Sequence, residues 1–104
     1  MATTTQALAR TAAATSSTTL YTVPTTTTIT VVSNIVLANA ATSASTATIA
    51  FDGVTIVPAV SIPANSVVGF DMKQVIPANA TPKVITGFAS TTAVSIHISG
   101  VEIS

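Results

Sequence analysis

The sequence predicts an all-β fold, a single antiparallel β-sandwich of jelly-roll type with an extended N-terminal arm. From Leu20 onward Val, Ile and Thr dominate the chain, and these β-branched residues favour strands. Pro, Gly and Asn recur at short intervals and divide the chain into seven or eight short segments. No segment of the domain shows a convincing 3.6-residue apolar period. Short strands at this spacing are typical of sandwiches and jelly rolls.

Residues 1–19 are predicted to form the arm, and residues 20–104 the sandwich domain. The arm consists mostly of Ala, Thr and Ser and has no apolar stripe that would dock a helix on a core. We expect it to become ordered where a partner receives it, by adding as a strand to an exposed sheet edge. Leu8 and Arg10 are the expected partner contacts, as an apolar peg and a charged anchor. The alternative is a terminus without a role.

The expected strands of the domain are 20–23, 28–38, 47–51, 54–57, 67–75, 83–88 and 93–104. Alternate residues of a strand point to opposite faces, so the apolar positions predict which side chains are buried. The nearly apolar odd positions of 28–38 are expected to face the core. The predicted core residues are Ile29, Val31, Ile35, Leu37, Ile49, Phe51, Val94, Ile96 and Ile98.

Turn residues separate these strands. Asp52-Gly53 between two apolar runs predicts a hairpin with a type I′ turn, which needs positive φ at both central residues. Ile-Pro-Ala-Asn occurs at 62–65 and again at 76–79, and each copy predicts a strand end followed by a turn. Gly69 and Gly100 are predicted sites of β-bulges, with Val101 and Ile103 on the buried side after Gly100.

The charge content excludes several functional classes. Charged residues make up 6% of the 104 residues, the net charge is zero, and Thr and Ser together supply 32 residues. Three basic residues are too few for electrostatic nucleic-acid binding. Zero cysteines exclude disulfides and thiolate chemistry. We therefore expect no enzyme activity, no catalytic residues, no cofactor and no metal site.

No membrane segment or secretory signal is predicted. The longest apolar candidate, residues 29–41, is interrupted by Thr30, Ser33, Asn34 and Asn39, whereas a spanning helix needs about 20 apolar residues. The first ten residues lack a basic region before an apolar one. Synthesis in the cytoplasm, without processing, is the expectation.

Few residues remain that carry chemistry. His97 is the single imidazole, and we interpret it as a strand residue that faces solvent or a neighbour. The alternative is a ring of His97 side chains around a threefold or sixfold axis, which could bind an anion or sense pH. Asp71 and Lys73 lie two apart in a strand, hence on one face, and are expected to pair with each other or to meet a neighbouring subunit.

The scarcity of charge favours an assembly. Soluble monomers normally use charge to stay apart, and a domain of zero net charge tends to associate. The surface of an assembly subunit is largely interface, where charged residues are depleted. The composition therefore predicts a homo-oligomeric structural unit.

Several short motifs resemble those of a family of small tailed-bacteriophage virion proteins. The motifs are Leu20-Tyr-Thr-Val-Pro24, Thr27-Thr28, Val32-Ser-Asn-Ile35 with Asn39, Ile62-Pro-Ala-Asn65 and Gly100-Val-Glu-Ile-Ser104. Their order and spacing carry the resemblance, which covers residues 20–104. The second Ile-Pro-Ala-Asn and the few aromatic residues of the middle strands depart from the family pattern.

The resemblance implies a virion structural protein located in the virion. It implies a capsid decoration (cement) protein that binds the assembled head and stabilises it. The expected partners are the major capsid protein or another virion structural protein, and other copies of the chain, with a homotrimer favoured. A tail or fibre accessory protein is the alternative within this class. A carbohydrate- or surface-binding module is the alternative from another class, since jelly rolls host lectins.

Overall fold

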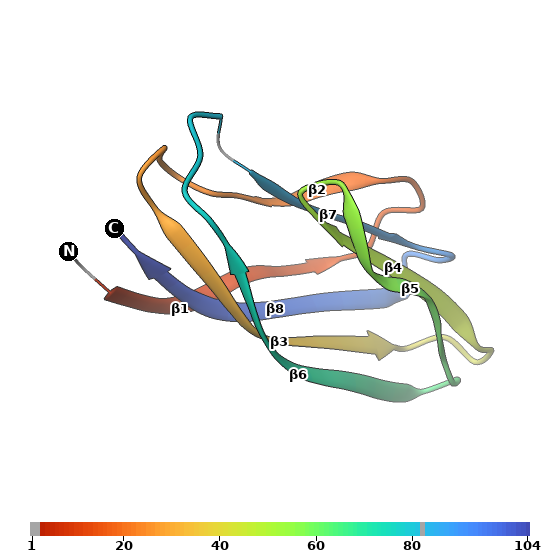
Figure 1. The fold of residues 1–104 in the computed structure, drawn as a ribbon. Helices are drawn as coiled ribbons and strands as arrows, with labels where there is room; N and C mark the ends of the chain where they lie inside the picture. The colour runs from red at the N-terminus through yellow and green to blue at the C-terminus, as the bar shows by residue number, and fades with distance from the viewer. Residues whose placement is uncertain (1–2, 82) are drawn as a thin grey trace.

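The computed structural model describes residues 3–81 and 83–104, and within them the chain forms two four-stranded antiparallel sheets packed as a sandwich (Figure 1). Sheet A has the strand order β1 (Thr3–Ala12), β8 (Val94–Ile103), β3 (Ile29–Asn39), β6 (Ser66–Ile76). Sheet B has the order β2 (Thr18–Thr22), β7 (Val84–Ala89), β4 (Ser45–Phe51), β5 (Val54–Ile62). The predicted all-β sandwich is confirmed.

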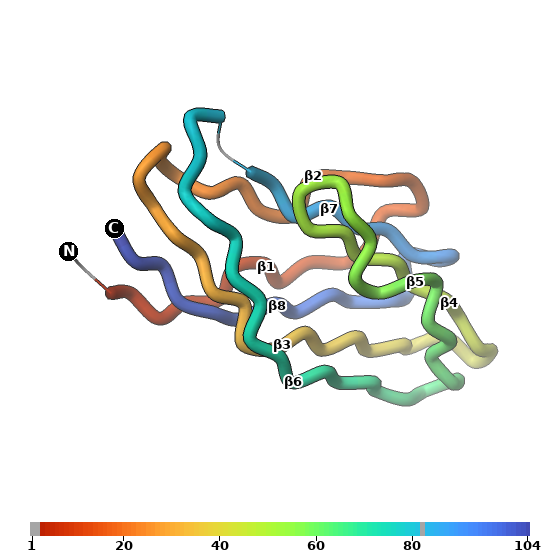
Figure 2. The backbone as a smooth tube through the Cα atoms, in the orientation of Figure 1, coloured from red at the N-terminus to blue at the C-terminus, as the bar shows by residue number. Residues whose placement is uncertain are grey.

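The strands pair in a nested order. β1 pairs with β8, β2 with β7, β3 with β6 and β4 with β5. Thr3 therefore lies opposite Ile103, and the first and last strands, β1 and β8, run side by side (Figure 2). Each sheet has two edge strands. β1 and β2 are the edge strands on one side of the sandwich, and β5 and β6 are the edge strands on the other side.

Most of the predicted arm is part of the sandwich. Residues 3–12 form β1, which pairs with β8 of the same chain, and Leu8, Ala9 and Ala13 belong to the core. The predicted boundary between residues 19 and 20 falls inside β2. The predicted division into an arm and a domain therefore does not match the structure. The reason is that β8 of the same chain already offers the sheet edge that an extended segment needs. Residues 1 and 2 of the arm lie outside the described residues.

β-bulges in β1, β2 and β3 are among the register shifts that decide which side chains enter the core. Leu8 in β1, Leu20 in β2 and Ser33 in β3 each lack a directly opposed residue in the register of the sheet. The two leucines pack on glycines: a Cβ atom on Gly100 would meet Leu8 Cδ1, and one on Gly87 would meet Leu20 Cδ1. Each glycine leaves the space that the bulged leucine of the adjacent edge strand fills.

Because of the bulge at Ser33, the core prediction for β3 is wrong on one side of the bulge. Ile35 and Leu37 are fully buried as predicted, but on the other side of the bulge Thr30 and Val32 are buried, while Ile29 and Val31 are half-buried. One extra residue exchanges the two faces of a strand. The remaining buried predictions are confirmed for Ile49, Val94, Ile96 and Ile98.

Phe51 is also less buried than predicted. It has the same parity as Ile49 and packs on the core, but it is half-buried. It stands at the end of β4, where the hairpin to β5 begins.

The predicted hairpin turn and both predicted strand ends are confirmed, whereas the predicted bulge positions are wrong. Asp52 and Gly53 both have positive φ, at 54° and 78°, as a type I′ turn requires. β5 ends at Ile62 and β6 at Ile76, each at the start of an Ile-Pro-Ala-Asn motif. Gly100 and Gly69 stay in register with their partners. The bulges near Gly100 lie on the adjacent strands, because the glycine admits the displaced leucine.

Replacing Gly100 by Ala is expected to lower the free energy of unfolding by roughly 1–3 kcal/mol or more. The new Cβ would overlap the carbonyl oxygen of Val31, a backbone atom that side-chain rotation cannot move away. Urea denaturation measures the change. The control is Ser99→Ala on the same strand, expected to change stability by less than about 0.5 kcal/mol. Equal stability of both variants would contradict this packing.

Truncating Leu8 to Ala is expected to cost roughly 2–5 kcal/mol, because its side chain is 7% exposed within the core. Thr5→Ala, at an exposed position of the same strand, is the control. A loss below about 1 kcal/mol for Leu8→Ala would show that β1 is a detachable arm after all.

Candidate interaction surfaces

The structure separates the two predicted partner contacts. Leu8 contacts its own chain at Gly100 and is buried, so in this arrangement it is not available to a partner. Arg10 is exposed on β1 and lies directly opposite His97 of β8. Arg10 therefore remains a predicted partner contact, at one edge of sheet A.

His97 lies between Arg10 and Val36 in the register of sheet A. Its side chain is half-buried on a strand whose alternate residues, Ile96 and Ile98, are in the core. His97 therefore lies on the outer face of the sheet, as the sequence predicts. Its directly paired neighbours are a cation and an aliphatic residue, which is not the setting of a catalytic triad.

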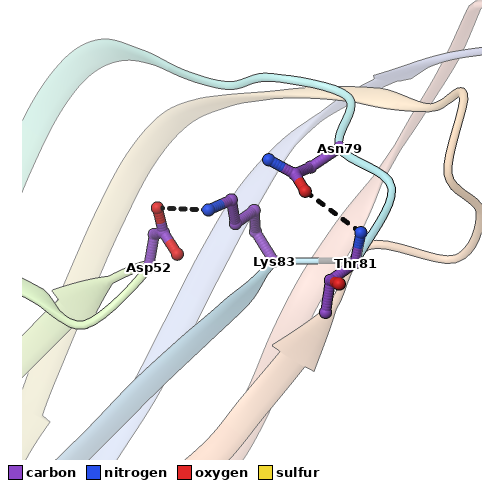
Figure 3. A network of polar contacts seen from close by, with 4 residues as sticks. All are labelled: Asp52, Asn79, Thr81 and Lys83. Carbon is purple, nitrogen blue, oxygen red and sulfur yellow. Dashed lines mark hydrogen bonds and ion pairs between the residues drawn. The ribbon is translucent and has the colours of Figure 1, made fainter.

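The ion pair of the described residues joins two loops. Lys83 Nζ lies 3.0 Å from Asp52 Oδ2, and Asn79 Oδ1 accepts a hydrogen bond from the Thr81 N–H at 3.0 Å (Figure 3). The Asp52 N–H donates to the Val84 carbonyl at 2.9 Å, so this hairpin turn is tied to β7. The pairing of Asp71 with Lys73 within the chain is not seen among these residues. Because both partners of the observed pair are partly exposed, it contributes little to stability.

Sequence reasoning missed a polar cluster that joins the two sheets. The Tyr21 hydroxyl of sheet B donates to Glu102 Oε2 of sheet A, and its oxygen lies 3.0 Å from Thr30 Oγ1. Because the phenol has one proton and gives it to the carboxylate, the Thr30 hydroxyl is the donor of the second bond. Burial, together with the Glu102 carboxylate, raises the pKa of Tyr21 to about 12. Tyr21 and Glu102 are the only residues of their types in the chain, which is the one hint that the sequence offered.

A second buried cluster surrounds Asn39, which is 2% exposed. Its side-chain Nδ2 donates to the carbonyls of Ser43, Ile62 and Pro63 at 3.0–3.3 Å, with one N–H shared. Its Oδ1 accepts from the Ala41 N–H at 2.9 Å. Asn39 thus holds the loop after β3 against the turn after β5. Asn39 contacts the first Ile-Pro-Ala-Asn motif, and Tyr21 contacts Glu102 of the C-terminal motif. Residues of the motifs that resemble the phage family therefore meet in both clusters, and both clusters stabilise the fold.

Sheet B presents an uncharged outer face. None of its four strands contains a charged residue. The register aligns Thr19, Thr86, Ala50 and Thr55 across the sheet. A shallow depression of about 250 Å³ lies on this face, lined by Ser17, Thr48, Ala50, Gly53, Thr55, Thr86, Gly87 and Phe88. Its lining side chains are hydroxyls and apolar groups, without a carboxylate or an amide.

The described residues contain no cluster of three or more His, Cys, Asp or Glu that could hold a metal ion. They also contain no helix long and apolar enough to cross a membrane.

Comparison with known proteins finds a similar fold in a virus. No protein-family model matches the chain, and no curated protein sequence matches it. Among solved structures, a chain in the structure of infectious bursal disease virus, Gx strain, superposes with a TM-score of 0.51 at 13% identity. The match covers 97% of this chain and 30% of the viral chain. This chain therefore spans less than a third of that chain, and the similarity concerns the fold alone.

The titration of Tyr21 is expected to be shifted upward in the folded protein. Its pKa of about 12 lies above the unfolded value near 10. The stabilisation from the protonated hydroxyl is therefore complete below pH 10 and is lost as the pH rises toward 12. Tyrosinate absorbance reports this residue alone, since the chain has one Tyr and no Trp.

The denatured protein serves as the reference for this titration, and Tyr21→Phe is expected to remove the alkaline loss of stability. A native midpoint near 10 would show that the cluster with Glu102 and Thr30 does not form.

Proposed function

We propose that this chain is a virion structural protein, and specifically a bacteriophage capsid decoration protein that binds the assembled head and stabilises it. The observation that carries the proposal is the outer face of sheet B, a complete four-stranded face with no charged residue in its strands. Interface cores are depleted of charge relative to free protein surface. Such a face is suited to lie against another protein.

The mechanism is binding without chemistry. A protein that binds only the assembled shell stabilises that shell by mass action. Many copies, each contacting neighbouring shell subunits, add their effects through multivalency. Threonine hydroxyls on the outer face supply hydrogen bonds to the backbone or side chains of the partner, and the aliphatic groups between them supply apolar contact.

The fold comparison supports the broader part of the proposal. A virus structure contains a chain that shares this fold over nearly the whole length of the present chain. The resemblance to small phage virion proteins supports the narrower part. We also propose that the sandwich is a jelly roll, and the nested pairing of first strand with last supports this.

Co-sedimentation tests the proposal. Purified chain is mixed with heads, and separately with detached tails, of the phage whose genome encodes it. Binding to heads, with heads more resistant to heating, is the expected result. Binding to tails alone would favour a tail accessory protein, and binding to neither particle would contradict a virion role.

A surface variant locates the contact. Thr55→Lys places a charge in the uncharged face, and unless that charge finds a partner its burial is costly. We expect the occupancy of this variant on heads to fall. Its dissociation constant should be at least about tenfold higher, which corresponds to a loss of about 1.4 kcal/mol of binding free energy. Thr5→Lys, an equal change at an exposed position of β1 in sheet A, is the control. Equal effects of the two variants would contradict the assignment of sheet B.

A further inference from the structure

The exposed large apolar side chains of the described residues gather at one edge of the sandwich. Val54 and Ile56 lie on β5 and are 71% and 37% exposed, and Val67 and Val75 lie on β6 and are 64% and 55% exposed. Three of them, Val54, Ile56 and Val75, line a groove between the two strands. β5 and β6 are the edge strands of sheets B and A on the same side. Apolar surface concentrated in this way marks an interaction site.

Contacts within the chain do not explain why residue 69, near the middle of β6, is a glycine. It stays in register opposite Val36, and its φ is not positive. A Cβ atom there would make only an ordinary contact at 3.9 Å with Val36. Gly87 and Gly100, by contrast, are filled by bulged leucines. A glycine inside a strand is destabilising and often marks a bulge, a tight bend or the close approach of a ligand or another backbone. Gly69 stays in register with its partner, which leaves close approach as the explanation that we use.

The charges of β6 are arranged so that the strand complements itself. Asp71 and Lys73 are both exposed and flank Met72, and neither forms an ion pair among the described residues. In an antiparallel pair of β6 strands centred on Met72, each Asp71 lies opposite the Lys73 of the other copy. The same register places the exposed Val75 of each copy opposite Gly69 of the other.

We propose that a second copy of this chain docks at β6, so that the two β6 strands pair antiparallel around a twofold axis at Met72 and join the two A sheets. The interface is isologous. It contains two reciprocal ion pairs between Asp71 and Lys73, and two contacts of Val75 on Gly69. The groove residues Val54 and Ile56 border the same edge. A twofold dimer takes the place of the trimer that the phage resemblance implies.

This edge adjoins the outer face of sheet B at Thr55, which lines both the groove and the depression, but the dimer proposal does not depend on the proposed function. The opposite edge is formed by β1 and β2. Within the described residues these two strands expose no large apolar side chain and contain no acidic residue. The competing reading of β6 is protection: Lys73 and the register irregularity between β3 and β6 would keep an edge strand unpaired. The oligomeric state distinguishes the two.

Light scattering and sedimentation of the isolated full chain, over nanomolar to micromolar concentrations, test the proposal. The expected species is a dimer of twice the 10.3 kDa chain mass. Asp71→Lys and Lys73→Asp each place like charges opposite one another and are expected to raise the dimer dissociation constant at least tenfold. The double variant restores opposite charges and is expected to recover most of the affinity. Thr5→Asp, which adds an acidic charge at an exposed position of β1 on the opposite edge, is the control and is expected to leave the dimer intact.

Gly69→Val separates dimerisation from folding. Val favours strands, and a Cβ atom at this position makes only an ordinary contact with Val36, so the monomer is expected to be as stable as the wild-type monomer or more so. The dimer is expected to weaken at least tenfold, because the new side chain occupies the space of the partner's Val75. Circular dichroism and thermal melting at dissociating concentration confirm the fold of every variant.

Three results would overturn the proposal. A wild-type monomer at all concentrations would favour edge protection, and a trimer is incompatible with an isologous pair of β6 strands. A dimer that is insensitive to Gly69→Val and to both charge reversals would lie at a different surface. Since none of these measurements uses a virion, failure here leaves the binding of heads to be judged by its own test.

Discussion

The packing of Leu8 against Gly100 holds the first strand of the chain to the last, and the arrangement of sheet A depends on it. β8 is regular, while its neighbours β1 and β3 both bulge beside residues 98–100. The glycine leaves room for the leucine, and the Ser33 hydroxyl donates to the Ser99 carbonyl at 3.1 Å. In sheet B, Leu20 packs on Gly87 in the same way. Both edge strands at the N-terminal end are thus fixed by an apolar contact in addition to backbone hydrogen bonds.

Buried polar groups then fix how the two sheets and their loops meet. Tyr21 connects sheet B to Thr30 and Glu102 of sheet A, and Asn39 binds the loops after β3 and β5 to each other. A buried polar group is costly unless it is bonded, so such clusters accept few alternative arrangements. Tyr21, Asn39 and Glu102 belong to the motifs that resemble those of the phage family. The resemblance therefore follows the framework of the fold, and the function that we propose rests on the outer surfaces.

Those surfaces differ in physical character. The outer face of sheet B is uncharged and rich in threonine, whereas the β5 and β6 edge combines exposed valines with one acid and one base on β6. A broad uncharged face is suited to a large partner with many small contacts. A narrow edge with ordered charges is suited to one register with one partner. The chain thus offers one surface suited to self-association and one suited to shell binding, and the two adjoin at Thr55.

The sequence by itself determined the approximate positions of the strands from β2 to β8, the Asp52-Gly53 turn, the strand ends at both Ile-Pro-Ala-Asn motifs and the core side of Ile35, Leu37, Ile49 and β8. These follow from local rules, namely alternation of side chains and the dihedral preferences of Gly, Pro and Asn. Only the tertiary structure decided the faces of Ile29 and Val31, the place of residues 3–12, and the partners of Tyr21 and Asn39. A bulge forms where a neighbouring strand leaves space, and Leu8 finds that space at Gly100, more than 90 residues away along the chain. No local pattern contains that information.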